Sequence, residues 1–187
     1  MEQKSISRTD VIMAGLGGMG VLMAGQILSR AALKKYQHVS WLPSYGVEKR
    51  GGLCECTVIF SHEEIASPLL DQAHTVVVFD GAQFKTFEPR VRTGGIMLVE
   101  NTGLQDEREK KDYELLRIPG LEVAVTMGES QVNNLILLGA YIATCKTLPP
   151  ELIEEELERR FATKKAIFER NQRVFRKGLE LIQNMES

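Results

Sequence analysis

The sequence predicts an α/β fold: a three-layer α/β/α arrangement with a mostly parallel or mixed sheet, a Rossmann-like start and a helical C-terminus. Three observations favour this class. A β-branched and apolar run at 9–14 stops at a glycine cluster and is followed by apolar residues at helical spacing. Further strand-like runs then alternate with helix-like segments, and the C-terminal part carries helical patterns alone. With 187 residues, the chain suits one domain spanning 1–187.

The individual elements follow from local patterns. The run TDVIMA predicts a buried first strand, and Val21, Ala24, Ile27, Leu28 and Ala31 predict an amphipathic helix after the glycines. Further strands are predicted at 38–42 (ended by Pro43), 53–60, 74–80, 96–99 (after Gly94-Gly95) and 113–118. Further helices are predicted at 82–91, 131–146, 151–161 and in the C-terminal segment through Leu181, and the charged stretch 101–112 predicts an exposed loop.

Composition excludes several classes of protein. Apolar residues make up 43% and charged residues 26%, as in ordinary globular domains. The net charge of −2 gives no overall attraction to nucleic acid or anionic lipid. No apolar run reaches the roughly 20 residues that a membrane span needs, and the N-terminus lacks the apolar stretch of a signal peptide. A cytoplasmic location is therefore expected.

The three cysteines do not form a metal-binding pattern. Cys54 and Cys56 make a C-x-C pair without a second pair, and Cys145 stands alone. On a strand, Cys54 and Cys56 face the same side, which suits two small residues in a core. We therefore expect no metal ion or iron–sulfur cluster to be held by this chain alone.

The glycine loop, residues 15–20, is the first candidate site. Gly15, Gly17 and Gly20 fit G-x-G-x-x-G between a strand and a helix, where free amides attract phosphate. Gly15, Gly17, Gly18 and Gly20 are thus candidate cofactor-binding residues. The acidic residue that a dinucleotide site needs about 20 residues later is absent from QHVSWLP. The alternatives for this loop are close packing of the helix on the sheet, and contact with a partner subunit or its cofactor.

The second candidate site is the loop SYGVEKRGG at 44–52. It combines an aromatic residue, charges of both signs and three glycines. Arg50 can pair with a carboxylate or phosphate across an interface, and Tyr45 can anchor one. Alternatively, Arg50 is a solvated loop arginine, and the ring of Tyr45 packs beneath its own loop.

Several motifs together resemble the gamma subunit of 2-oxoacid:ferredoxin oxidoreductases. They are GLGGMG, SYGVEKRGG, TVIFSHEEIASPLL, VVVFD, NNLILLGAYIA and the closing KKAIFERNQRVFRKG, in this order. The family often has glutamine where Met19 stands and proline where Val47 stands. The resemblance implies that 1–187 is a gamma-type domain, with Tyr45, Gly46, Arg50, Gly51 and Gly52 at a subunit interface or in the active-site environment.

The resemblance also implies the reaction. The holoenzyme decarboxylates a 2-oxoacid, forms acyl-CoA and reduces ferredoxin. Thiamine diphosphate, Mg and iron–sulfur clusters serve the holoenzyme on other subunits, and coenzyme A is a co-substrate. The implied partners are the alpha and beta subunits, a ferredoxin-like delta subunit as a further candidate, and ferredoxin as electron acceptor. The isolated chain is expected to be inactive.

The loop form and the segment IPGLEVA favour 2-oxoglutarate as substrate, with 2-oxoisovalerate and pyruvate versions as alternatives. A free-standing nucleotide-binding α/β protein is a further alternative. No residue is assigned a catalytic role, and His38, His62 and His74 are interpreted as structural or surface residues. Asp80 either helps a ligand site or caps a helix, and Asn133 and Asn134 either cap a helix or meet a partner.

Overall fold

A computed structural model describes residues 8–45, 51–105 and 112–186. The strands are β1 (Arg8–Leu16), β2 (His38–Tyr45), β3 (Leu53–Ser61), β4 (Ala73–Val78), β5 (Val91–Glu100) and β6 (Glu114–Ile118). The α-helices are α1 (Val21–Ala32), α2 (Phe84–Phe87), α3 (Gly120–Thr126), α4 (Asn133–Cys145), α5 (Pro150–Arg160) and α6 (Lys165–Glu186). Short 3-10 turns are η1 (Gly81–Gln83), η2 (Glu88–Arg90) and η3 (Ser130–Val132).

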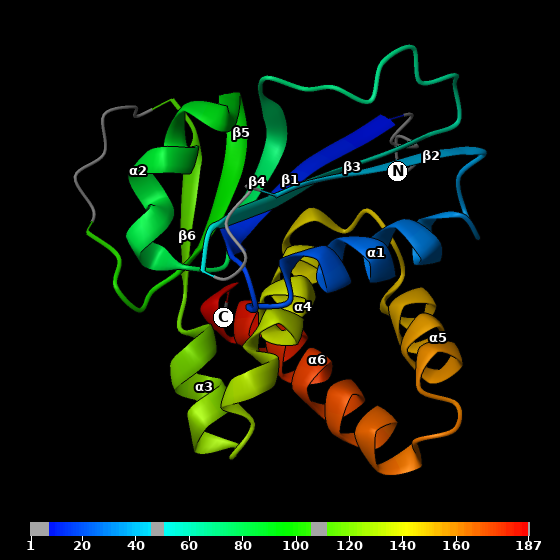
Figure 1. The fold of residues 1–187 in the computed structure, drawn as a ribbon, viewed down its shortest axis with the longest axis vertical. Coiled ribbons are helices and arrows are strands. Elements are labelled where there is room, and N and C mark those ends of the chain that lie inside the picture. The colour runs from blue at the N-terminus through cyan, green and yellow to red at the C-terminus, as the bar shows by residue number, and fades with distance from the viewer. Residues whose placement is uncertain (1–7, 46–50, 106–111, 187) are drawn as a thin grey trace.

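The strands form one mixed sheet in the order β2-β3-β1-β4-β5-β6 (Figure 1). β1, β4, β5 and β6 are parallel, whereas β3 runs antiparallel to both of its neighbours. The predicted α/β class is thus confirmed. The sheet differs from a dinucleotide-binding unit, because an antiparallel strand, β3, separates β1 from β2, where such a unit pairs its first two parallel strands directly.

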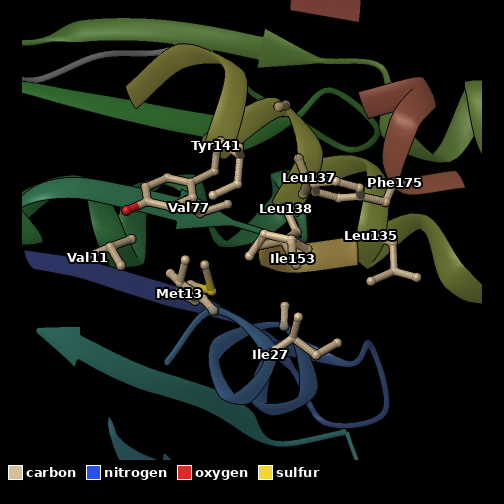
Figure 2. Packing of buried hydrophobic residues seen from close by; sticks show 14 of the residues in the cluster. Val11, Met13, Ile27, Val77, Leu135, Leu137, Leu138, Tyr141, Ile153 and Phe175 are labelled. Atoms are coloured by element: carbon tan, nitrogen blue, oxygen red, sulfur yellow. The ribbon is translucent and has the colours of Figure 1, made fainter. Parts of the chain in front are cut away.

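One face of the sheet carries the main core. Strand residues Val11, Met13 and Val77 point toward α1 and α4, and side chains from α5 and α6 close the same cluster (Figure 2). Helix α4 buries all of its residues from Asn133 to Ile142. Each large aliphatic side chain buried there contributes about 1.5–3 kcal/mol to the free energy of unfolding, so α4 is the central helix of this layer.

Helices α4 and α6 cross at two glycines. A Cβ on Gly139 would stand 2.3 Å from the carbonyl oxygen of Phe175, and a Cβ on Gly178 would stand 2.2 Å from that of Ile136. The two backbones therefore touch at a distance that no larger residue permits.

The opposite face is covered more thinly. Its cluster gathers the alternate strand residues, such as Ile12 and Val76, beneath Phe84 and Phe87. Arg90 joins this layer to the sheet, since its guanidinium donates to the carboxylate of Glu55 at 3.0 Å and to the carbonyl of Leu70 at 3.0 Å. Figure 1 shows α2 on this side, away from the other labelled helices.

Three predicted elements need correction, and one helix was not predicted. Pro43 does not end the second strand, because β2 lies at the sheet edge, where the missing amide of a proline is tolerated. Gly94 and Gly95 lie inside β5, beside a register shift opposite Ala73 and Thr75. The expected helix over 82–91 is instead the succession η1, α2 and η2, with Pro89 in η2. Helix α3 was not expected, because its β-branched residues do not favour helix.

Within the described part of the chain, none of the helices has both the length and the apolar character needed to cross a membrane.

Candidate functional site

The candidate site lies at the edge of the sheet where the four parallel strands end. Open α/β sheets commonly place their sites outside the carboxyl ends of such strands. The glycine loop follows β1 at this edge. Because β3 is antiparallel to β1, its first residue, Leu53, pairs with Leu16, the last residue of β1. Gly51 and Gly52, the described end of the connection from β2 to β3, are therefore brought to the same edge.

The two loops singled out in the sequence meet there. The amide of Gly17 donates to the carbonyl of Gly52 at 2.9 Å. A Cβ on Gly17 would stand 3.6 Å from the amide nitrogen of Gly51. The glycine loop and the Gly51-Gly52 end of the second loop thus form one continuous surface of backbone. Tyr45 is the last residue of β2, while its side chain and residues 46–50, including Gly46 and Arg50, lie outside the described residues.

Two amides of the glycine loop are already engaged inside the chain. Gly17 bonds Gly52, and the amide of Met19 donates to the carbonyl of Leu16 at 3.2 Å. Gly20 caps α1 in the left-handed conformation with φ 78°, and the first turn of α1 has no acidic residue. No acidic side chain therefore neutralises the positive end of the α1 dipole, which favours an anion. The engaged amides of Gly17 and Met19, however, leave fewer donors for a ligand than the G-x-G-x-x-G pattern predicts.

Packing accounts for two of the loop glycines. A Cβ on Gly15 would stand 3.1 Å from the Cβ of Phe79, and a Cβ on Gly20 would stand 2.5 Å from Nδ2 of Asn134. Asn134, which is 1% exposed, donates from this Nδ2 to the carbonyl of Gly20 at 3.2 Å. Asn134 therefore neither caps α4 nor lies free for a partner. It fastens the glycine loop to α4, a contact between residues 114 positions apart.

Gly18 and Gly51 remain open. Both have positive φ values, 97° and 76°, and apart from the glycine and its chain neighbours no atom of the described residues lies within 4 Å of a Cβ built on either. Leu53, next to them, is 45% exposed. Bare backbone beside an exposed leucine permits the close approach of another surface.

The acidic residues at this edge serve the loops. Oδ1 of Asp80 accepts the amide of Ala82 at 3.2 Å and caps η1, which confirms one of its two predicted roles. Glu100 is 2% exposed, and its two oxygens accept the amides of Thr102 at 3.0 Å and Leu121 at 2.9 Å. Both carboxylates bind backbone amides and are poorly placed to exchange protons with a substrate.

The cysteines do not fit an iron–sulfur cluster. Cys56 packs against α1, and burial raises the pKa of its thiol to about 12. Burial, with a smaller effect of Glu55, raises the pKa of Cys54, and burial raises the pKa of Cys145 to about 11. A cluster takes four cysteine ligands, whereas Cys54 and Cys56 lie on β3 and Cys145, the third cysteine of the sequence, contacts Thr75 of β4. Among the described residues, no group of three or more His, Cys, Asp or Glu side chains is placed to hold a metal ion.

The histidines are dispersed. The ring of His62 stacks on Tyr36 with centroids 4.7 Å apart, His38 begins the edge strand β2, and His74 lies in β4 at the other end of the sheet. The structure brings none of them to the glycine loop.

Comparison with known proteins decides the family. Residues 10–181 match the family model described as pyruvate ferredoxin/flavodoxin oxidoreductase. The chain belongs to this oxidoreductase family. The match confirms the resemblance to gamma-type chains that the two loops indicate.

Relatives of the family differ in length. Ketoisovalerate oxidoreductase subunit VorA of Methanothermobacter marburgensis is 34% identical over 171 residues, which are 91% of this chain and 36% of VorA. The chain therefore spans about a third of that relative. The 2-oxoglutarate synthase subunit KorC of the same organism is 28% identical over 182 residues, covering 94% of this chain and 97% of KorC.

Solved structures of the oxidoreductase family share the fold. The gamma subunit of a keto/oxoacid ferredoxin oxidoreductase from Geobacter sulfurreducens superposes with a TM-score of 0.77 at 24% identity, covering 92% of this chain and 96% of that one. This likeness supports the α/β arrangement of the sheet and its helices.

Proposed function

We propose that this chain is the gamma-type subunit of a 2-oxoacid:ferredoxin oxidoreductase and that it contributes a docking surface to the complex. In this proposal the alpha and beta subunits carry thiamine diphosphate, Mg and iron–sulfur clusters, with a ferredoxin-like delta subunit as a further partner. Thiamine diphosphate supplies the electron sink for decarboxylation. Coenzyme A receives the acyl group, and ferredoxin receives the electrons.

One observation carries the proposal: the two family loops join at Gly17 and Gly52 to form an open backbone surface. The open positions at Gly18 and Gly51 and the exposed Leu53 give a partner subunit a place to approach closely. The nearby carboxylates of Asp80 and Glu100 bind amides of the chain itself. This combination suits a subunit that supplies shape to an active site held elsewhere.

The test is reconstitution with the alpha and beta subunits. We expect the isolated chain to show no 2-oxoacid oxidation and the complex to reduce ferredoxin when a 2-oxoacid and coenzyme A are present. Oxidation by the isolated chain at the rate of the complex would contradict the proposal.

A pair of leucine variants localises the docking surface. Leu53→Glu places a charge beside the joined loops, whereas Leu69→Glu changes a leucine that is 72% exposed in the connection between β3 and β4. We expect Leu53→Glu to weaken assembly by about ten-fold or more in dissociation constant and Leu69→Glu to leave it unchanged. Equal behaviour of the two variants would place the interface elsewhere.

The substrate is also proposed. The greater identity to VorA than to KorC favours 2-oxoisovalerate, whereas the loop form SYG-x-E-x-RGG favours 2-oxoglutarate. Pyruvate is a third candidate. The kcat/KM values of the reconstituted complex with these three acids decide between them, and we expect 2-oxoisovalerate to be preferred.

A further inference from the structure

The two edges of the sheet differ in how they are protected against pairing with another strand. β6, at one edge, has only five residues and carries Glu114 and Arg117. β2, at the other edge, has eight residues, none of them Lys, Arg, Asp or Glu, and pairs with β3 residue by residue along its length (Figure 1). Proteins usually blunt an open edge with charges, prolines, bulges or short strands. The segment 38–42 has none of these, since the proline of β2 is Pro43.

Pro43 indicates which backbone groups of β2 face outward. In an antiparallel pair, alternate residues of a strand direct their amides to the neighbour, and the residues between direct theirs away. A proline has no amide, so Pro43 is tolerated where this group would point away from β3. Trp41 and Val39 lie two and four residues before it and present their amide and carbonyl groups on the same, outer side. Within the described part of the chain, β2 pairs with β3 alone, and no backbone hydrogen bond outside that ladder involves either residue.

Apolar side chains accompany these backbone groups. Val39 and Trp41 are half-buried against the main core, on the face of the sheet that α1 covers. Leu33, just after α1, is 62% exposed and lines the same hollow beside the strand as Val39. Backbone hydrogen bonds give affinity when a strand is added to an open edge, and neighbouring apolar contacts strengthen it. This edge therefore has the features of a surface that another strand covers.

We propose that β2 pairs antiparallel with β2 of a second copy of this chain, across a two-fold axis at Ser40. In this register, Val39 of each copy lies opposite Trp41 of the other, and each such pair exchanges two hydrogen bonds between amide and carbonyl groups. Moving the axis one residue forward would place Val39 opposite Pro43, which has no amide to donate. Moving it one residue back would place Trp41 opposite Gln37, before the strand begins. The edge thus complements itself, as an interface between identical copies requires.

The helix next to this edge leaves room for the pairing. The two-fold axis is perpendicular to the sheet, so α1 of both copies lies on the same face. α1 lies over β3, since a Cβ on Gly25 would meet Sγ of Cys56. Three strand spacings, about 14 Å in total, therefore separate the two α1 axes. Helices pack directly at about 8–10 Å, so side chains such as that of Leu33 fit between them. The pairing uses neither of the joined loops and is independent of the proposed function.

The mass of the full chain in solution provides the first test. Sedimentation equilibrium should give twice the mass of one chain. Ser40 lies opposite Ser40 of the second copy in the proposed register, so Ser40→Lys brings two like charges together. We expect this variant to raise the dissociation constant of the dimer by about ten-fold or more. Ser44→Lys, at an exposed position of the same strand beyond the paired segment, is the control and should leave the constant unchanged.

A mixture of opposite charges separates pairing from folding. Ser40→Glu alone should weaken the dimer as Ser40→Lys does. An equal mixture of the two variants should form a heterodimer, because the facing charges then attract each other. A variant that has lost its fold would not be rescued by mixing, and melting temperatures of the single variants identify such a loss.

A disulfide tests the register. Facing residues of a non-hydrogen-bonded antiparallel pair have Cα atoms about 4.5 Å apart, a distance that a disulfide spans. Ser40→Cys should therefore cross-link two copies under mild oxidation. Ser44→Cys and the parent chain, which carries the three native cysteines, should not.

Several results would overturn the proposal. They are a parent chain that stays monomeric at the highest concentration measured, a Ser40→Lys variant that dimerises as tightly as the parent, and a mixture of the Lys and Glu variants that remains monomeric. Cross-linking of Ser44→Cys in place of Ser40→Cys would overturn the position of the two-fold axis.

Discussion

Glycines bring backbones together in two regions of this molecule, with different results. At the crossing of α4 and α6, Gly139 and Gly178 meet carbonyl groups of the facing helix, so the chain itself fills the space. In the joined loops, Gly18 and Gly51 face, apart from their own chain neighbours, no atom of the described residues within 4 Å of a Cβ position. The same residue type thus closes a core in one region and leaves a surface open in the other.

This difference in the space around the glycines distinguishes those that stabilise the fold from those that leave room for a partner. A glycine whose Cβ position is occupied is required by the fold, and its replacement should lower the free energy of unfolding. A glycine whose Cβ position is empty is required by something outside the chain or by its backbone angle alone. The following substitutions sort the glycines by these criteria.

Gly139→Ala should have the largest effect. The new Cβ would stand 2.3 Å from the carbonyl oxygen of Phe175, so the helices must separate. We expect a loss of about 3 kcal/mol in the free energy of unfolding, measured by urea denaturation. Gly17→Ala is the control, because its Cβ would make an ordinary contact at 3.6 Å, and it should stay within about 1 kcal/mol of the parent. An unchanged free energy of unfolding in Gly139→Ala would show that the two helices are not in tight contact at this crossing.

Gly20→Ala should come next. Its φ of 78° costs an alanine about 1–2 kcal/mol, and its Cβ would clash with the amide of Asn134. The clash disappears in an Asn134→Ala background, so we expect Gly20→Ala to cost less there. Denaturation of the two single variants and the double variant measures this coupling. Strict additivity would show that Asn134 does not hold the loop.

Gly18→Ala should affect stability less. Only its φ of 97° opposes the change, because the Cβ position is open. We expect a loss of about 1 kcal/mol. If the open surface docks a partner subunit, assembly of the reconstituted complex should fall further than this loss explains. Sedimentation of the complex measures it, and normal assembly would count against the docking role.

The ion pair beside the helix crossing should give the smallest effect. Arg176 donates to Glu154 at 2.6 and 2.7 Å, which holds the pKa of this carboxyl below its ordinary value of 4.5 despite partial burial. A lowered pKa means that the pair stabilises the fold at neutral pH, and that this contribution declines as the pH falls from about 4.5 through the lowered pKa. Glu154→Gln should therefore cost about 0.5 kcal/mol at pH 7 and less at pH 3. Chemical denaturation at both values tests this, and an equal loss at both would exclude a charge effect.

Local patterns predicted the elements whose residues settle their own conformation. The apolar runs of β1, β3 and β4 and the stripe of α1 are visible in the sequence, and so is the helical C-terminus. The strand order is not visible, because nothing local places β3 between β1 and β2. The continuation of β2 through Pro43 likewise depends on its edge position, which only the assembled sheet reveals.

The sequence indicates the two loops of the candidate site but not the contact between them. The glycines at 15–20 and 51–52 stand out by composition, but their contact arises from the antiparallel pairing of β1 with β3. The sequence indicates Asn134 only as a helix cap or a contact to a partner. Its bond to Gly20 joins two distant helices, and no spacing rule in one sequence indicates such a pair.

Helix α3 illustrates a constraint of another kind. Its start is capped by Glu100, which accepts the amide of Leu121 from 21 positions away. A Cβ on Gly120 would stand 2.7 Å from the same carboxylate. Positions 100 and 120 should therefore change together during evolution. Lineages that replace the acid are expected to lose this short helical turn or to recruit a new side chain to cap it.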